Sequence, residues 1–107
     1  MKESTIHLSL QQIEQVSHEY AEKFGIDRNP VYFLLKVQEE VGELTQAFMM
    51  LHHLGRQKSQ NSEQLQEAFQ AEFADALYHL LLLGIHHEID IEQAIRQKWL
   101  RYLSEEA

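Results

Sequence analysis

Apolar residues recur at helical spacing near the start of the chain. Five of them are separated by three or four positions: Leu10, Ile13, Val16, Tyr20 and Phe24. This spacing aligns them on one side of an α-helix. Ser9 followed by Gln12 resembles a capping box, and Gly25 is a residue typically found just after a helix. The pattern predicts a first helix over residues 10–24.

The same reasoning predicts the remaining elements. Three further helices are expected, over residues 30–54, 62–87 and 91–103. Asn29 and Pro30 are favoured at the start of a helix, and Asp90 is a favoured cap before the last one. No segment shows the alternating pattern of a β-strand. We therefore expect a single all-α domain over residues 1–107, built as a four-helix bundle.

Two of the predicted helices carry paired carboxylates. Glu40 and Glu43 lie three residues apart in the second helix, and Glu72 and Asp75 do so in the third. Because an α-helix has about 3.6 residues per turn, each pair occupies neighbouring turns of one helix face. A single pair of this kind is most often solvated, but two pairs in neighbouring helices suggest a shared site.

These acids lie among apolar residues. Successive helical residues are rotated by about 100°, which groups Glu40 with apolar side chains of its helix. These are Phe33, Val37, Leu44, Ala47 and Leu51. The segment 71–85 is apolar nearly all round, which is typical of a buried helix, and Glu72 shares its sector with Leu65 and Leu83. We therefore expect both helices to carry carboxylates into the interior.

A buried carboxylate needs a cation or a proton. Leaving it ionised and unpaired is costly, yet no Lys or Arg occurs between Asn61 and Glu92. Carboxylates that converge without basic partners would repel one another, and a divalent ion would neutralise them. Ligands that are all oxygen suit Mg²⁺, or Mn²⁺ in its place. The pattern predicts a magnesium site between the second and third helices.

Composition and charge limit the other possibilities. The chain has 107 residues, no Cys and a formal net charge of -8. This charge disfavours binding to a nucleic-acid polymer, whose phosphates are neutralised by clusters of Lys and Arg, but it allows a nucleotide that arrives with Mg²⁺. No apolar run is long enough to span a membrane, and the N-terminal residues lack the apolar core of a signal peptide. We expect a cytoplasmic protein with no membrane contact.

Two polar residues near the acidic motifs have more than one possible role each. Lys36, one turn before Glu40, can contact phosphate or form ion pairs with Glu39 and Glu40 at helical spacing. His79 follows Asp75 by four residues, so it can contact a substrate, orient a carboxylate or remain a core His. Both residues are candidates for substrate binding.

Other candidates for substrate binding lie outside the two acidic motifs. Arg28 precedes a helix N-terminus, which favours an anion, although a solvated loop Arg is the simpler interpretation. Lys98 and Arg101 can complement a helix C-terminus or reach phosphate. Three aromatic residues are possible partners for a base, or core residues: Phe48, Tyr78 and Trp99.

The ordered acidic motifs resemble those of a known family. Glu39-Glu40-x-x-Glu43 followed by Glu72-x-x-Asp75 is similar to the EExxE…ExxD signature of the MazG-like all-α nucleoside triphosphate pyrophosphohydrolases. The surrounding residues are similar as well, and the resemblance extends over residues 28–98. Lys98 matches a Lys of the family's last helix, whereas Tyr102 stands where the family often has Asn.

The resemblance implies an activity and roles for the acids. The family hydrolyses nucleoside triphosphates, with ribose or deoxyribose, between the α- and β-phosphates and releases a monophosphate and pyrophosphate. Carried over by position, Glu40, Glu43, Glu72 and Asp75 would be ligands of Mg²⁺, and Glu39 would activate the attacking water or help to hold a further ion. The family also implies a homodimer or homotetramer with substrate sites built between chains. The expected duty is clearance of the nucleotide pool.

Two other classes of function remain open at this point. A di-iron carboxylate protein also places acids inside a helical bundle, but it usually uses Glu-x-x-His on two helices, and no Glu here has His three residues later. A non-catalytic helical regulatory module could use the acidic surface to bind a basic partner. An assay of nucleotide turnover separates these classes.

Overall fold

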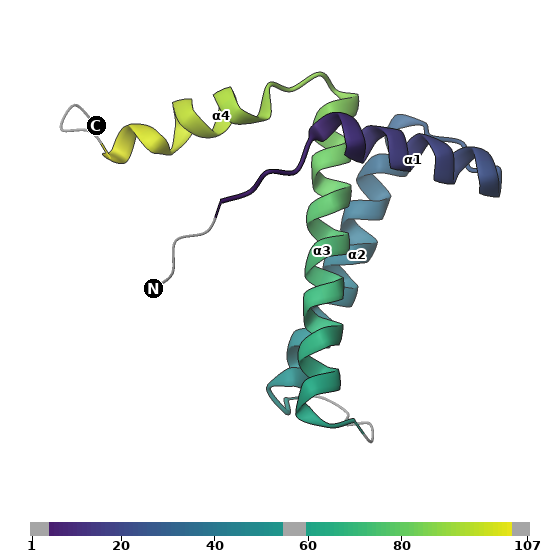
Figure 1. Cartoon of the computed structure of the whole chain (residues 1–107), viewed down its shortest axis with the longest axis vertical. Coiled ribbons are helices and arrows are strands. Elements are labelled where there is room, and N and C mark those ends of the chain that lie inside the picture. Colours follow the sequence, from purple (N-terminus) through teal and green to yellow (C-terminus); the bar gives the residue numbers. More distant parts are fainter. Residues whose placement is uncertain (1–4, 55–59, 104–107) are drawn as a thin grey trace.

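The computed structural model describes residues 5–54 and 60–103, which are helical apart from their connections (Figure 1). The elements are α1 (Leu10–Phe24), α2 (Pro30–Leu51), α3 (Ser62–His86), α4 (Ile91–Lys98) and the short 3₁₀ helix η1 (Leu100–Leu103). Within these ranges there is no β-strand. The predicted all-α class with four α-helices is confirmed.

Polar capping side chains account for where the helices begin. The Ser9 side chain accepts hydrogen bonds from the first turn of α1, and Asn29 accepts one from the Tyr32 N–H. Asn61 and Gln64 form a reciprocal capping box at the start of α3, and Asp90 caps α4. These side chains satisfy N–H groups that have no partner within a helix.

The predicted end of the second helix was wrong by one turn. The helix stops at Leu51 because His53 adopts a left-handed backbone, with φ 57°. The Leu54 N–H then bonds to the Met49 carbonyl and the His53 N–H to that of Met50, the pattern of a Schellman motif. Gly is the usual residue at the left-handed position after a helix, and a His there is unusual. The glycine at position 55 therefore indicated an end that lies too late in the sequence.

The last predicted helix is divided in the structure. Regular α-helix ends at Lys98, and Leu100–Leu103 form a 3₁₀ turn. The α4 helix extends away from the other helices (Figure 1), although the Ile91 side chain at its start lies against Gly84. A Cβ at Gly84 would meet Ile91 Cδ1 at 3.2 Å, so this small residue allows the two helices to approach.

An antiparallel pair, α2 and α3, forms the body of the molecule. They lie side by side along the longest axis, and α1 crosses one end of the pair (Figure 1). The core is centred on Phe33, Leu82 and Ile13, one from each of these helices. The crossing of α1 against this end builds part of the wall of the pocket described below.

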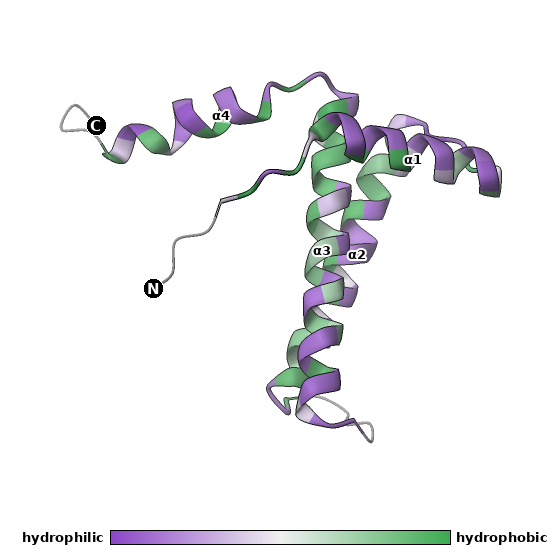
Figure 2. Ribbon diagram, viewed as in Figure 1, coloured by the Kyte–Doolittle hydropathy of each residue, from purple (hydrophilic) through white to green (hydrophobic). Residues whose placement is uncertain are grey.

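The third helix is not covered on all sides by its own chain. Leu65 and Leu82 are buried as its pattern predicts, but Phe73 and Leu80 are each about half exposed, at 53% and 52%. Figure 2 shows apolar residues along α2 and α3 and polar residues over much of α1. None of the described helices has the length and hydropathy needed to cross a membrane.

Candidate functional site

Three carboxylates from two helices converge near the middle of the α2–α3 pair. Glu40 and Glu43 come from consecutive turns of α2, and Glu72 comes from α3. One oxygen from each lies within 4.8 Å of the others. Ligands bound to Mg²⁺ at about 2.1 Å are separated by up to about 4.2 Å, so small side-chain movements would bring all three onto one ion. The two acidic motifs thus meet as their pattern predicts.

Glu40 is the deepest of these acids. It is only 6% exposed, and its Oε1 lies 3.4 Å from the Lys36 Nζ. Its Oε2 and the Oε2 of Glu72 are buried and have no hydrogen-bond partner among the described residues. Buried oxygens without partners are rare in native proteins, and a cation between them would satisfy both. The donor set therefore fits a hard divalent ion such as Mg²⁺.

The charged groups of this region shift one another's pKa values. Burial raises the pKa of Glu40, Glu43 raises it further, and Lys36 acts in the opposite direction. Burial alone would lower the pKa of Lys36, but Glu39 and Glu40 outweigh this and raise it. The ammonium group is therefore firmly charged and partly offsets the acidic cluster.

Lys36 forms both ion pairs that its spacing allows. Its Nζ lies 3.4 Å from Glu39 Oε1 and the same distance from Glu40 Oε1. Glu39 is the more exposed of the two acids and lies outside the group of three carboxylates. The predicted pairing role of Lys36 is confirmed, and contact with phosphate remains a prediction.

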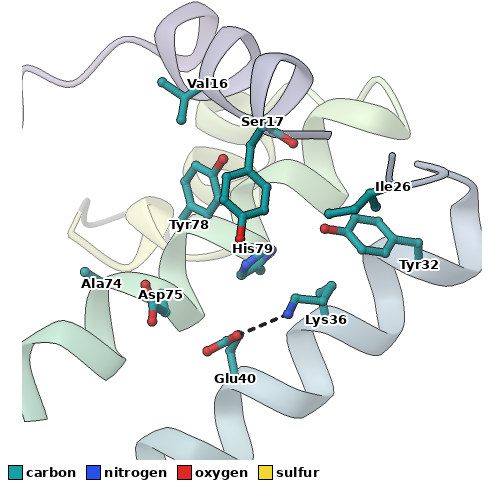
Figure 3. Close-up of a pocket in the computed structure, with 11 residues that line it drawn as sticks. Val16, Ser17, Ile26, Tyr32, Lys36, Glu40, Ala74, Asp75, Tyr78 and His79 are labelled. Atoms are coloured by element: carbon teal, nitrogen blue, oxygen red, sulfur yellow. Dashed lines mark ion pairs between the residues drawn. The ribbon is translucent and has the colours of Figure 1, made fainter. Parts of the chain in front are cut away.

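Asp75 and His79 lie beside the three carboxylates, in the wall of a pocket of about 600 Å³. Figure 3 shows Lys36, Glu40 and Asp75 on one side of this pocket, with His79 between them and Tyr78. Asp75 is exposed, although both acidic helices were expected to carry their carboxylates into the interior, because that side of α3 is open to the pocket. Its role as a fourth ligand remains a prediction.

His79 has an unsatisfied ring nitrogen. Burial lowers the pKa of His79, Lys36 lowers it further, and the nearby carboxylates act in the opposite direction. Its Nδ1 is buried and lacks a hydrogen-bond partner in the described ranges. A neutral imidazole whose ring nitrogen lacks a partner beside a pocket is suited to contact a ligand, and its role in substrate binding remains a prediction.

Arg28 has a structural role that the sequence did not reveal. It forms an ion pair with Glu14, and its side chain is 17% exposed. Its guanidinium also lies over the Phe33 ring, 5.2 Å from the ring centre. These contacts fix α1 to the start of α2, so Arg28 is not the solvated loop residue that the simpler interpretation proposed.

The C-terminal candidates lie apart from this site. Lys98 ends α4 and Arg101 is in η1, and neither lines the pocket of its own chain. Phe48 and Trp99 also lie outside the pocket wall, whereas Tyr78 is part of it. Of the three aromatic candidates, only Tyr78 is thus placed beside the carboxylates.

Several pocket residues were missed from the sequence. The α1 helix contributes Ser17 and Tyr20, and the start of α2 contributes Tyr32. Their spacing contains no local signal for a ligand, because their roles arise from the crossing of α1 over the α2–α3 pair. Ser17 offered a hint, since a hydroxyl in an apolar stripe, here 6% exposed, requires a polar partner.

Comparison with known proteins identifies the family of this chain. Comparison with curated proteins gives no match. The model of the phosphoribosyl-ATP pyrophosphohydrolase family matches residues 3–98, which include every helix through α4 and the whole acidic cluster. This family is a branch of the MazG-like all-α superfamily, which confirms the resemblance at that broader level. The chain therefore belongs to the phosphoribosyl-ATP pyrophosphohydrolase family, whose activity is that of a hydrolase acting on acid anhydrides.

Proposed function

We propose that the chain is a Mg²⁺-dependent pyrophosphohydrolase that converts (d)NTPs into monophosphates and pyrophosphate. The observation that carries the proposal is the convergence of Glu40, Glu43 and Glu72 beside a pocket large enough for a nucleotide. A triphosphate needs its charge neutralised, and an acidic cluster can do this only through a bound cation. The family match supports a nucleotide-like substrate.

The metal would be held by the acidic residues of α2 and α3. Glu40, Glu43 and Glu72 supply the first oxygens, and Asp75 completes the set from the pocket wall. When bound, Mg²⁺ neutralises phosphate charge and polarises the phosphorus centre. The unpartnered oxygens of Glu40 and Glu72 support this assignment.

The remaining polar residues position the reactants. Glu39 is exposed and lies one residue before Glu40, the buried metal ligand, so its carboxylate can take the proton of the attacking water. Water then supplies the new P–O bond, and the bond between the bridging oxygen and the attacked phosphorus breaks. Lys36 is placed to contact phosphate oxygens, and His79 to donate or accept a hydrogen bond at the substrate.

Phosphoribosyl-ATP is a second candidate substrate. It is favoured by the family match over residues 3–98. Its triphosphate is the same chemical group, so the acidic cluster would serve both reactions. The difference between the substrates lies at the base, which carries an additional phosphorylated ribose in phosphoribosyl-ATP.

We also propose that the working protein is a homodimer or homotetramer. An apolar groove runs between α2 and α3 and is lined by Val37, Val41, Leu44, Phe73, Ala76, Leu77 and Leu80. Phe73 is more than half exposed in this chain, and a second copy would cover it. In such an assembly Lys98 and Arg101 would approach phosphate from a neighbouring copy, since they lie away from the pocket of their own chain.

Separation of reaction products tests the proposed function. The protein is incubated with a panel of NTPs, dNTPs and phosphoribosyl-ATP, with Mg²⁺ or with chelator, and the products are separated by anion exchange. Formation of monophosphates and pyrophosphate from plain nucleotides supports the proposal. Formation of diphosphate and phosphate contradicts the bond assignment, and no turnover of any substrate contradicts the enzymatic proposal.

A further inference from the structure

The last helix leaves the body of the molecule and buries none of its own residues. We call residues 91–103, which comprise α4 and η1, the C-terminal arm. No residue of either element is buried, and the arm extends away from the α2–α3 pair (Figure 1). Isolated helices shorter than about 12–15 residues are only marginally stable in water. The α4 helix has 8 residues, so it needs a surface to pack against.

Packing at the root of the arm fixes the direction in which it leaves. Glu88 has a left-handed backbone, with φ 55°, and the Ile89 N–H donates a hydrogen bond of 3.0 Å to the Gly84 carbonyl. The Ile91 side chain packs against Gly84 and leaves little room for a Cβ at that position. A helix that is held away from its own body in this manner presents its apolar side to another molecule.

The C-terminal arm combines an apolar ridge with an excess of positive charge. Ile91, Ile95 and Trp99 recur every four residues and therefore form one ridge along the helix. Ile95 and Trp99 are 49% and 62% exposed. The arm carries three Lys or Arg side chains and one acid, whereas the rest of the described chain, residues 5–54 and 60–90, carries three Lys or Arg and 13 acids. A basic arm thus projects from an acidic body.

A matching surface lies at the mouth of the pocket beside the carboxylates. Val16 and Tyr20, four residues apart on α1, line this pocket and are each more than half exposed. Figure 3 shows Val16 and Asp75 in the wall of the same pocket, and Asp75 is exposed. Ridges of residues spaced by four on two helices can interdigitate, so the ridge of the arm fits that of α1. The neighbouring carboxylate favours a basic helix at this place.

We propose that the C-terminal arm of one copy docks across the mouth of the pocket of a second copy, with Ile95 and Trp99 against Val16 and Tyr20. This inference rests on the assembly proposed above and specifies the contact that the arm makes in it. Docking covers apolar surface that each copy otherwise exposes, and it brings the basic arm to the acidic body. A membrane is a poorer occupant, because the anionic lipids that attract the arm would repel the body.

The chain has no Cys, which allows a cross-linking test that does not depend on turnover. Protein carrying Val16→Cys is mixed with protein carrying Ile95→Cys, treated with a short bismaleimide and analysed by mass spectrometry. The matched control uses Val31→Cys in place of Val16→Cys, because Val31 is similarly exposed but lies at the start of α2, outside this pocket. The inference predicts a link between the two different chains for Val16 and Ile95, in several times the yield of the control pair.

Fluorescence gives a second measurement, because Trp99 is the one Trp of the chain. Acrylamide should quench Trp99 severalfold more strongly in Val16→Glu than in wild type, and Val31→Glu should leave the quenching unchanged. Circular dichroism verifies that both variants are folded, and light scattering gives the number of copies in each species.

The outcomes separate the docking of the arm from the assembly itself. A wild-type dimer or tetramer in which both cysteine pairs cross-link equally would overturn the docking and leave the assembly standing. The same conclusion follows if Trp99 is as accessible in wild type as in Val16→Glu. A wild-type protein that light scattering shows to be a single chain would refute both.

Discussion

The Lys36 ammonium lies 3.4 Å from Oε1 of Glu40, a carboxylate that is only 6% exposed. This ion pair gives the buried acid a positive neighbour in the metal-free protein. A divalent ion bound by Glu40 would take over that function, and the two cations would then repel each other. The Lys36–Glu40 pair is therefore part of the energetics of metal binding as well as of folding.

The first prediction concerns this competition. Replacing Lys36 by Gln should raise the affinity for Mg²⁺ severalfold, because two charges at such a distance interact by about 1 kcal/mol even in a water-like medium. The same change should raise the KM for the nucleotide, since the ammonium is placed to contact phosphate. Calorimetry and steady-state kinetics check the two effects. Lys23→Gln at the exposed end of α1 is the control, and weaker Mg²⁺ binding by Lys36→Gln would show that the ammonium does not compete with the metal.

The second prediction concerns the dependence of stability on pH. The pKa of Glu40 is raised above its usual value of 4.5, chiefly by burial. The folded state then binds more protons than the unfolded state, so this residue costs stability as the pH rises from about 4.5 through its raised pKa. Without metal, Glu40→Gln should be more stable than wild type at pH 7.5, by about 1 kcal/mol or about 4 °C in Tm.

Thermal unfolding from pH 4.5 to 8, with and without Mg²⁺, measures this effect. Wild type should gain stability from Mg²⁺ at neutral pH and lose that gain as Glu40 is protonated, whereas Glu40→Gln should gain little at any pH. Glu67→Gln on the same helix as Glu72 serves as the control, because its carboxylate lies outside the acidic cluster. A Glu40→Gln protein that is less stable than wild type without metal would contradict the prediction.

The third prediction concerns the ligand contributed by α3. Glu72→Gln should lower kcat/KM by at least about a hundredfold, because it removes one of the charged oxygens that hold the ion. Glu67→Gln, five residues earlier on α3, should remain near wild-type activity. Equal effects of the two changes would mean that general charge on α3, not the cluster, is responsible for activity.

The fourth prediction concerns assembly. Wild type should elute as a dimer or tetramer in size-exclusion chromatography with light scattering. Phe73→Glu should shift it toward a single chain, because a charge would have to be buried in the apolar groove. Phe24→Glu is the matched control, since Phe24 is similarly exposed at the end of α1, outside that groove. A wild-type species of 12.6 kDa would contradict the assembly.

Local sequence signals predicted the elements and the acidic motifs well. Asn29 and Asp90 cap the helices that they were expected to cap, because a short polar side chain before a helix has few other roles. The meeting of Glu40 and Glu72 followed from their apolar surroundings, which required both helices to face one interior. These features depend on residues a few positions apart.

Features that depend on long-range packing were not predictable in this way. The pairing of Arg28 with Glu14 joins residues of two helices, and the roles of Ser17 and Tyr32 arise only when α1 crosses the α2–α3 pair. The left-handed His53 and the 3₁₀ turn after Lys98 likewise oppose the local signals of a downstream Gly and a continuing apolar pattern. The exposure of Phe73 also depends on how the helices pack, which the apolar pattern of α3 alone does not specify.

The central claim is that Glu40, Glu43 and Glu72 together hold a divalent ion. The most direct test is a crystal of the protein soaked with Mn²⁺ and an α,β-methylene nucleotide, examined by anomalous scattering at the manganese edge. The account predicts a peak within about 2.3 Å of an oxygen from each of the three residues, facing the α–β linkage of the nucleotide. A peak bound elsewhere, or three carboxylates directed toward bulk solvent with no peak between them, would contradict it.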